Sequence, residues 1–349
     1  RTAVFITVTY EDVLRHILKF MKILFLFFVL ISAVATAQTT YSFDDSARTK
    51  RIVYDISVLA DDSLMGREGG SEYEMRAGNY IISEYTKCGL IPVPGADGFR
   101  QEFVLRKTTN EKGDSVSVTS NNILGYIENN APYTIVIGGH YDHIGYYYKD
   151  SLLHINNGAD DNASGAVGVM EVARYLSSGN LTRYNYILAC WGSEEQGLVG
   201  SNYFCSSNLF PFNKMAFYVN FDMIGRLGWK TDQLDVFGLG TTQLWDSLVP
   251  ETEYKSYKLK KFAGAVDASD HTCFYKNKTP YIYFTSGLPP VYHTPKDETP
   301  LINPKGVEII ISYAEEIIGR FDGSKPAFRT VSQKEMNKVY WYFLSQFMN

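Results

Sequence analysis

The clearest pattern along the chain is an alternation of short apolar runs with longer segments whose apolar residues recur near the helical period. The apolar runs predict strands at Tyr133–Ile137, Tyr184–Trp191, Met215–Met223, Leu234–Gly238 and Thr279–Phe284. The intervening and following segments predict helices at Asp161–Leu176, Leu198–Ser206, Thr241–Leu248 and Lys305–Phe321. This order predicts an α/β fold of three layers, a mostly parallel mixed β-sheet with helices on both faces.

The amino-terminal part of the chain is predicted to add helices and antiparallel strands. Ser46–Ala60 and Ser71–Cys88 carry apolar residues at helical spacing. Strands are expected at Gln101–Lys107, Asp114–Thr119 and Asn122–Glu128, the first two paired around Asn110–Gly113. The tail from Ser324 ends in an aromatic, helix-like segment. No repeat, low-complexity block or linker interrupts the chain, so residues 38–349 are expected to form a single catalytic domain.

A leader-like segment precedes this domain. Residues 21–38 read MKILFLFFVLISAVATAQ, a short basic start followed by an apolar run and the small-residue end Ala35-Thr36-Ala37. This pattern is typical of a signal peptide at residues 21–37, so the protein is expected to be exported, periplasmic or secreted. The apolar run is short for a bilayer span, and no stable membrane anchor is expected after cleavage. Residues 1–20 are interpreted as an upstream extension outside the mature protein.

Charge and cysteine content narrow the classes of partner. Acidic side chains outnumber basic ones, 38 to 33, and no basic run occurs, which argues against nucleic acid as a partner. The four cysteines are too few for a disulfide scaffold, and the sequence does not fix their pairing. The 26 tyrosines and 21 phenylalanines would suit a surface that contacts sugars or peptides, but aromatic side chains dominate cores as well.

Side chains of the types that can bind metal ions follow nearly every predicted core strand. They are His140 and Asp142, Asp160 and Asp161 at the next helix start, Glu194 and Glu195, Asp222, and His293 after the last strand. Because the carboxyl ends of parallel strands meet at one edge of a sheet, these side chains are expected to lie together. Unrelated polar residues would have no reason to recur at strand ends. The sequence therefore predicts a metal-dependent hydrolase.

The types of ligand indicate which metal. Two imidazoles and several carboxylates, without cysteine, suit Zn²⁺ and could accept Mn²⁺ or Co²⁺. Five ligands drawn from these side chains would exceed the need of one open tetrahedral zinc ion, and they would fit two ions that share one carboxylate with a water between them. Glu194 and Glu195 are adjacent, so on extended backbone their side chains diverge. One of them can bind metal while the other acts as general base.

Six motifs in this region, in this order, resemble those of the M28 dizinc metallopeptidases, the family that includes the bacterial leucyl aminopeptidases. They are GGHYDH at Gly138–His143, GADDNASG at Gly158–Gly165, SEEQGLVGS at Ser193–Ser201, NFDMIGR at Asn220–Arg226, SDH at Ser269–His271 and VYHTPKD at Val291–Asp297. The resemblance covers roughly residues 50–322. It implies a zinc-exopeptidase-like fold and two Zn²⁺ per chain.

The resemblance also implies a role for each site residue. Asp161 would bridge the two ions, His140 and Asp222 would complete one ion, and Glu195 and His293 the other. Glu194 would be the general base, and Asp142 would orient the imidazole of His140. The family often has a cis peptide after the bridging aspartate, here between Asp161 and Asn162.

The expected activity is that of an aminopeptidase, which removes amino-terminal residues from peptide substrates by means of a metal-bridging water. The side-chain pocket is expected at the aromatic loops Tyr146–Tyr148 and Phe262–Val266. The preferred first residue, dipeptidase or carboxypeptidase action, and the oligomeric state are left open by the sequence.

Several alternatives remain. His143 and His154 are expected to be loop or surface residues, and Asp160 to cap the following helix. Ser269-Asp270-His271 could suggest a serine hydrolase, but no G-x-S-x-G motif supports it. A glutaminyl-cyclase-like acyltransferase of the same fold, which typically uses one zinc ion, is one alternative function. A non-catalytic receptor-type ectodomain is the other, although such relatives generally lose ligands that this chain keeps.

Overall fold

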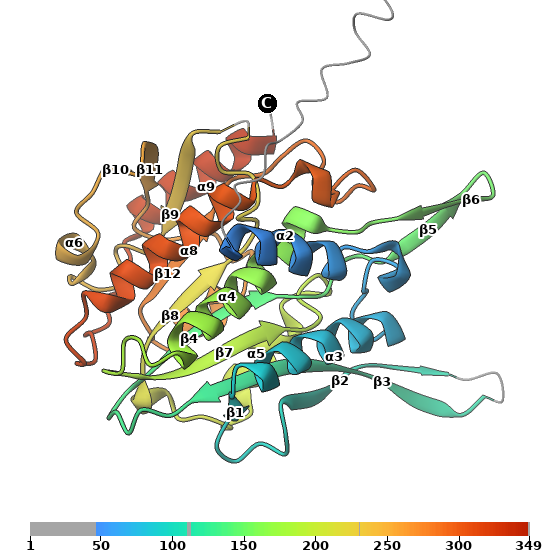
Figure 1. The fold of residues 1–349 in the computed structure, drawn as a ribbon, viewed down its shortest axis with the longest axis horizontal. Coiled ribbons are helices and arrows are strands. Elements are labelled where there is room, and N and C mark those ends of the chain that lie inside the picture. The colour runs from blue at the N-terminus through green and yellow to red at the C-terminus, as the bar shows by residue number, and fades with distance from the viewer. Residues whose placement is uncertain (1–46, 110–112, 230, 348–349) are drawn as a thin grey trace, which may run out of the picture. The chain divides into compact units, whose positions relative to one another are not determined.

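A computed structural model describes residues 47–109, 113–229 and 231–347, and Figure 1 shows their fold. The predicted extension and signal peptide at residues 1–37 lie outside the described residues, as does most of the turn expected at Asn110–Gly113. The described residues belong to one compact unit, Phe43–Asn349. Within them, no helix combines the length and the apolar character that a membrane crossing requires.

Ten of the described strands form one mixed β-sheet in the order β1-β3-β7-β4-β8-β12-β9-β11-β10, with β2 also paired to β3. Their bounds are β1 Ile91–Pro92, β2 Arg100–Thr109, β3 Ser115–Ile127, β4 Thr134–His140, β7 Asn185–Trp191, β8 Met215–Phe221, β9 Gln233–Phe237, β10 Glu253–Tyr254, β11 Tyr257–Lys261 and β12 Tyr281–Thr285. The central strands β7, β4, β8 and β12 run parallel to one another. Antiparallel pairs flank them, β3 against β7 on one side and β9 against β12 on the other.

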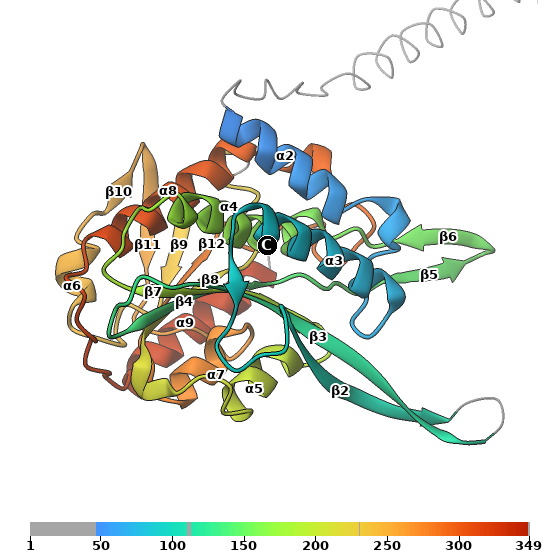
Figure 2. The same ribbon diagram turned by 60° about the horizontal axis from the view of Figure 1, so that its bottom comes forward.

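Helices cover both faces of this sheet, as Figure 2 shows. One face carries α2 Ala47–Leu59, α3 Glu72–Lys87, α4 Gly165–Ser177 and α8 Pro304–Gly319; the other carries α5 Val199–Ser206, α7 His271–Lys276 and α9 Gln333–Phe347. The short helices are α6 Trp245–Leu248, η1 Asp62–Leu64, η2 Ala159–Ser164, η3 Phe212–Lys214 and η4 Thr299–Leu301. The predicted three-layer α/β architecture is confirmed.

Alternating side chains of the central strands fill two separate cores. In β4, Ile135 and Ile137 face the core beneath α2, α3, α4 and α8, whereas Val136 faces the core beneath α5, α7 and α9. The same alternation continues in β7, where Leu188 joins the first core and Trp191 the second. Strands buried on both faces have apolar residues at nearly every position, which is why the sequence shows continuous apolar runs there.

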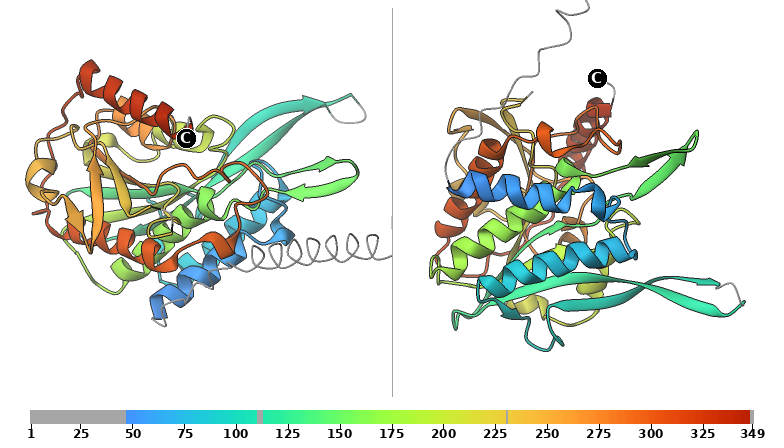
Figure 3. Two further views of the ribbon diagram at one scale, coloured as in Figure 1. Left: turned by 90° about the horizontal axis from the view of Figure 1, so that it is seen from above. Right: turned by 45° about the vertical axis from the view of Figure 1, so that its right-hand side comes forward.

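Some local predictions are wrong. Asp114–Thr119 and Asn122–Glu128 are not separate strands, because β3 runs unbroken through both and pairs with β2 and β7. The helix expected from Asp161 begins as α4 only at Gly165, after the irregular turn η2. Residues 146–155 form an unpredicted hairpin of β5 Tyr146–Lys149 and β6 Leu152–Ile155, which projects on the same side as the β2–β3 hairpin (Figure 3).

Candidate metal centre

Four neighbouring parallel strands deliver predicted site residues to one edge of the sheet. His140 is the last residue of β4, and Asp222 directly follows β8. Glu194 and Glu195 come shortly after β7, and His293 lies in the loop that follows β12. The structure brings the five predicted ligands together in two groups that could each hold a metal ion, and Asp161 belongs to both groups.

The carboxylate of Asp161 lies between these groups with its two oxygens turned to different sides. Oδ1 lies 3.3 Å from Nε2 of His140, and Oδ2 lies 3.1 Å from Nε2 of His293. A carboxylate shared by two ions has this arrangement, with one oxygen available to each.

The backbone around Asp161 is fixed by side chains from other segments. The peptide bond between Asp161 and Asn162 is cis. The carboxylate of Asp297 accepts hydrogen bonds from the backbone N–H groups of Asp160 and Asp161, at 3.0 and 2.9 Å. The side chain of Asn162 donates to the carbonyl of Phe221 at 3.0 Å and accepts from the N–H of Met223 at 3.1 Å, which ties this turn to the end of β8.

The first group consists of His140, Asp161 and Asp222, all buried. Nε2 of His140 lies 3.5 Å from Oδ1 of Asp222. The other oxygen of Asp222 accepts a hydrogen bond of 2.7 Å from the hydroxyl of Ser269. Ser269 therefore leaves Oδ1 of Asp222 directed at the imidazole of His140.

Asp142 supports this group and also the turn after β7. Its carboxylate lies 3.7 Å from Nδ1 of His140, while its backbone carbonyl lies closer to that nitrogen, at 3.3 Å. The same carboxylate accepts the N–H groups of Glu194 and Glu195, at 3.0 and 3.3 Å. Asp142 thus contacts the predicted ligand on β4 and holds the pair of glutamates in place.

Glu194 and Glu195 point to different parts of the site. Glu195 belongs to the second group with Asp161 and His293, whereas Glu194 belongs to neither group. The carboxylate of Glu194 lies 3.9 Å from Nε2 of His140, at the edge of the first group. Glu194 therefore lies beside the first group and belongs to neither ligand set.

His143 is a member of the second group: it lies in the loop after β4, as expected of a loop or surface residue, but it is buried and faces a possible ligand set. Its side chain is fully buried, and Nδ1 lies 2.7 Å from Oε1 of Glu195. The sequence gives one signal, its place directly after Asp142, but the family resemblance assigns it no ligand position. His154 is half-buried in the β5–β6 hairpin and stacks on Tyr147, with ring centroids 5.0 Å apart.

The charge balance around His293 is compatible with a bound cation. Nε2 of His293 lies 3.1 Å from oxygens of both Asp161 and Glu195, yet it is buried without a hydrogen-bond partner among the described residues. Burial lowers the pKa of His293, but these two carboxylates outweigh it and raise the pKa to about 10. A lone pair facing two carboxylate oxygens requires a proton or a metal ion between them. The donor set therefore fits a cation.

Two other expectations are resolved by the hydrogen bonds. Asp160 does not cap α4, because its Oδ1 accepts the N–H of Gly225 at 2.7 Å and its Oδ2 lies 3.5 Å from Nε of Arg226. Asp160 therefore joins η2 to the segment after β8. Ser269 and His271 form no catalytic pair, since Ser269 donates to Asp222 while the ring of His271 stacks on Tyr283, with centroids 5.3 Å apart.

A small, mainly apolar pocket adjoins the metal centre. Its wall includes Met223, which follows Asp222, and Tyr283, whose pKa is raised well above its usual range by burial and then by the carboxylate of Asp222. Ala265 and Val266 also line it, so part of the predicted Phe262–Val266 loop lies at a pocket. Tyr146–Tyr148 do not line it, because they are exposed on the hairpin.

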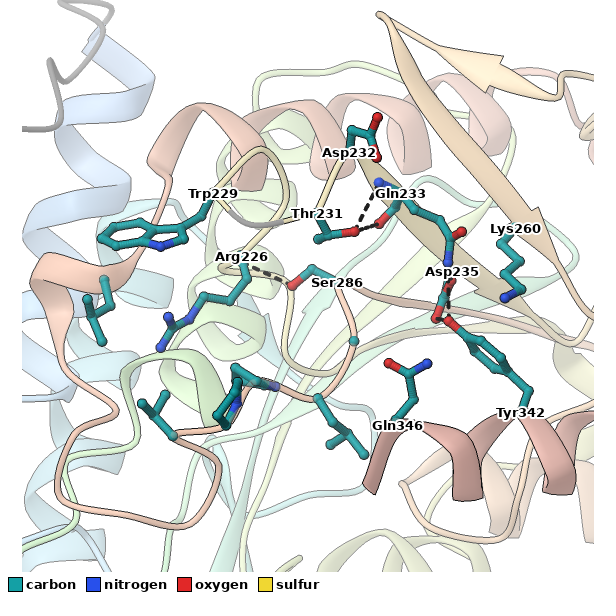
Figure 4. A pocket seen from close by; sticks show the side chains of 16 residues that line it. Arg226, Trp229, Thr231, Asp232, Gln233, Asp235, Lys260, Ser286, Tyr342 and Gln346 are labelled. Carbon is teal, nitrogen blue, oxygen red and sulfur yellow. Dashed lines mark hydrogen bonds between the residues drawn. The ribbon is translucent and has the colours of Figure 1, made fainter. Parts of the chain in front are cut away.

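A larger pocket of about 570 Å³ shares part of its wall with the small one. Figure 4 shows Tyr342 and Gln346 of α9 beside Asp235 and Lys260 in this pocket. The hydroxyl of Tyr342 donates to Asp235 at 2.6 Å, and Lys260 lies 3.7 Å from the centroid of the Tyr342 ring. Asp235, Tyr342 and Gln346 line both pockets, so the aromatic tail forms part of their wall, and none of the five predicted ligands lines the larger pocket.

Three comparisons place these observations among known proteins. The model of Peptidase family M28 matches residues 122–318. Leucine aminopeptidase 2 of Trichophyton rubrum is 28% identical over 203 residues, which are 54% of this chain and 40% of that protein. The leupeptin-inactivating enzyme 1 of Streptomyces exfoliatus is 30% identical over 197 residues, 56% of this chain and 39% of that protein. The chain thus spans about two fifths of the length of these relatives.

Solved structures share the fold at low sequence identity. The zinc aminopeptidase BSAP of Bacillus subtilis superposes with a TM-score of 0.60 and 17% identity, over 81% of this chain and 99% of that one. The glutaminyl cyclase of Porphyromonas gingivalis superposes equally well, with a TM-score of 0.60 and 18% identity over 77% of this chain and 97% of that one. The match to the family model covers more than half of the chain and includes all five predicted ligands and both residues predicted to assist them. The chain belongs to peptidase family M28.

Proposed function

We propose that this chain is a zinc-dependent exopeptidase that acts as an aminopeptidase on peptide substrates. One observation carries the proposal: the two oxygens of Asp161 face two separate ligand groups, and the carboxylate of Glu194 lies beside the first group without joining either. The names of the relatives, which include leucine aminopeptidases, support the same activity.

Two zinc ions fit the donor set. Asp161, His140 and Asp222 would hold one ion, and Asp161, Glu195 and His293 the other. When bound, the ions would polarise the scissile carbonyl and make a water molecule acidic enough to attack it. Asp142 and Ser269 would keep His140, Asp222 and the two glutamates in position through the contacts described above.

Glu194 would carry the proton. Burial raises its pKa well above the usual range, the carboxylates of Asp270, Asp222 and Glu195 add to this, and His140 opposes it. A carboxylate of raised basicity accepts a proton from water more readily at neutral pH and can return it to the leaving amine. The backbone N–H of Glu194, held by Asp142, fixes where that carboxylate stands.

The small pocket beside Met223 would receive the side chain of the first residue of the substrate. Its wall of Met223, Phe237, Ala265, Val266 and Leu288 favours an apolar side chain. The carboxylates that do not bind metal would attract the free amino group of the substrate.

We also propose that the protein is exported. The leader-like segment at residues 21–37 supports this, as does the disulfide between Cys205 and Cys273, because disulfides persist mainly in oxidising compartments.

The alternative function with a specific observation behind it is glutaminyl cyclisation, since a glutaminyl cyclase shares the fold. The complete set of two ligand groups favours hydrolysis over this alternative. The presence of all five predicted ligands and of Glu194 also argues against a receptor-type ectodomain without activity.

A panel of aminoacyl chromogenic substrates, assayed with and without a chelator, tests the activity. Apolar first residues should be released fastest, and the chelator should abolish their release until zinc is restored. A glutaminyl peptide assayed in parallel should be hydrolysed and not cyclised. Formation of pyroglutamyl peptide, or no release from any substrate by zinc-loaded protein, would contradict the proposal.

Replacement of the proposed base tests the mechanism. Glu194→Gln should lower turnover by about 10²- to 10⁴-fold, because the amide cannot accept the proton. Zinc content should be unchanged, since Glu194 belongs to neither ligand group. Glu102→Gln on the exposed face of β2 is the matched control and should leave turnover unaltered. Near-normal turnover of Glu194→Gln would exclude Glu194 as the base.

A further inference from the structure

His143 lies against the metal centre although the family resemblance assigns it no role. Its side chain is fully buried, and Nδ1 lies 2.7 Å from Oε1 of Glu195. It also lies 3.9 Å from Oδ2 of Asp161, and its ring meets that of His293 edge-on, with centroids 5.5 Å apart. The site therefore contains a third imidazole, within the second group of possible ligands.

The two oxygens of Glu195 have different partners. Oε1 is the oxygen in contact with His143, whereas Oε2 lies 3.1 Å from Nε2 of His293. Nε2 of His293 is the same distance from Oδ2 of Asp161. Oε2 of Glu195 and Oδ2 of Asp161 thus both lie close to Nε2 of His293, whereas Oε1 of Glu195 contacts His143.

The contact distances of His293 and His143 distinguish two ligands of one ion from a hydrogen bond to a ligand. Two ligand atoms about 2.0–2.1 Å from one tetrahedral zinc ion lie roughly 3.3–3.5 Å apart. The two 3.1 Å contacts of His293 are close to that separation. The 2.7 Å contact of His143 with Glu195 is instead the length of a hydrogen bond to a carboxylate. The 3.9 Å distance between Nδ1 of His143 and Oδ2 of Asp161 is longer than the separation of two ligand atoms on one tetrahedral zinc ion.

We propose that His143 is a positioning residue of the metal centre. Its Nδ1–H donates to Oε1 of Glu195 and so turns Oε2 toward the ion that Asp161 and His293 hold. A hydrogen bond from outside the ligand set restricts the rotation of a ligating carboxylate and raises metal affinity. The inference rests on the proposed two-ion site, but not on the reaction that the site performs.

The surroundings of His143 hold its ring in this place. Its backbone N–H donates to the carbonyl of Arg67 at 3.3 Å, and Glu68 pairs with it in an isolated β-bridge. Gly158 packs against the ring with φ of +56°, and a Cβ at that position would lie 2.5 Å from Cδ2 of His143. The residue that leads into the Asp161 turn must therefore lack a side chain for the imidazole to reach Glu195.

Zinc affinity of the metal-free protein, measured by competition with a chromogenic chelator, tests the proposal without any assay of activity. In His143→Ala the dissociation constant of one zinc site should rise about 10- to 100-fold, while that of the other site stays unchanged. His143→Asn, whose amide N–H can stand near the position of Nδ1, should restore that site to within a few-fold of the native value. His154→Ala is the matched control, because His154 lies on the hairpin away from both groups, and it should change neither site.

The other outcomes overturn the proposal in distinguishable ways. Unchanged affinity in His143→Ala would mean that the hydrogen bond has no role in metal binding. An equal loss at one site in both variants would make His143 a direct ligand, and an equal loss at both sites would indicate a general structural role. If the native chain binds two zinc ions as described but releases no amino acid, the proposed function fails while this inference stands.

Discussion

At the scale of single residues, the buried carboxylates carry a high free-energy cost. Burial raises the pKa of Asp160 and Glu194 well above the usual range, and that of Asp270 to about 7. Neither oxygen of Asp270 has a hydrogen-bond partner within the part of the chain that the structure describes. Such a concentration of acidic groups is costly without cations, and the two proposed zinc ions would supply the missing positive charge.

One buried carboxylate lies outside the ligand groups and gives a prediction for pH dependence. Glu74 in α3 accepts hydrogen bonds of 2.6 Å from Ser120 and from the N–H of Gly70, and burial raises its pKa to about 8. The folded protein therefore binds this proton more tightly than the unfolded chain does. The resulting stabilisation is complete below pH 4.5 and is lost as the pH rises to about 8, at about 1.4 kcal/mol per pH unit.

Glu74→Gln should remove this dependence. The variant should gain stability relative to the native protein between pH 5 and pH 8, as measured by urea unfolding of both proteins at the two pH values. Glu72→Gln on the exposed side of the same helix is the control and should change the free energy of unfolding little at either pH. An identical pH dependence of native and Glu74→Gln protein would show that Glu74 is not buried as a neutral acid.

The sequence identified the residues at the metal centre better than their neighbours. His140, Asp161, Glu195, Asp222 and His293 stand at strand ends or in motifs, and the structure brings them together. His143 was missed because a histidine in a loop carries no sign of burial in its own sequence. The sequence favours a capping role for Asp160 because its actual partners, Gly225 and Arg226, are remote in sequence.

At the scale of elements, the turn that carries Asp161 depends on a buried arginine. Arg67 donates to the carbonyls of Tyr141 at 2.7 Å, Leu59 at 3.0 Å and Gly158 at 2.7 Å, and also to the carbonyl of Asn157. A longer contact of 3.5 Å reaches the carbonyl of Asp161 itself. All five donors of the guanidinium thus hold the end of α2, the residue after His140 and the approach to η2 together.

Arg67→Ala should therefore destabilise the protein strongly. It leaves several buried carbonyl groups without donors, at about 1–3 kcal/mol each, so a total loss of more than about 3 kcal/mol is expected. Urea unfolding of chelator-treated protein measures this loss apart from any change in zinc binding. Arg76→Ala, which removes an exposed ion pair with Glu72 on α3, should cost less than about 1 kcal/mol. Equal effects of the two variants would mean that the Arg67 contacts contribute little.

Elements built by local pattern were predicted well, and elements built by tertiary contacts were not. The apolar runs of β4, β7 and β8 are fully buried, so their sequences alone indicate buried strands. The delayed start of α4 reflects non-helical backbone at Asp161 and Asn162, which the contacts to Asp297 and Phe221 maintain. The continuity of β3 depends on its pairing with β2 and β7, which its own sequence does not show.

At the scale of the described molecule, the strand order explains why one site forms. Placing β4 between β7 and β8, with β12 beside β8, brings four carboxyl ends side by side although their residues are far apart in the sequence. The sequence predicts a mostly parallel mixed sheet but not this strand order. The wall that α9 contributes to the two pockets follows from the same arrangement, because β9 holds Asp235, which accepts the hydrogen bond from Tyr342 of α9.

The central claim is that two ions, shared through Asp161, are required for peptide hydrolysis. Metal-free protein titrated with zinc, with bound zinc and aminopeptidase activity followed together on the best aminoacyl substrate, tests it most directly. Activity should reach its maximum only when two zinc ions are bound per chain, and Asp161→Asn should bind fewer ions and remain inactive. Full activity at one zinc ion per chain, or none at two, would contradict the account.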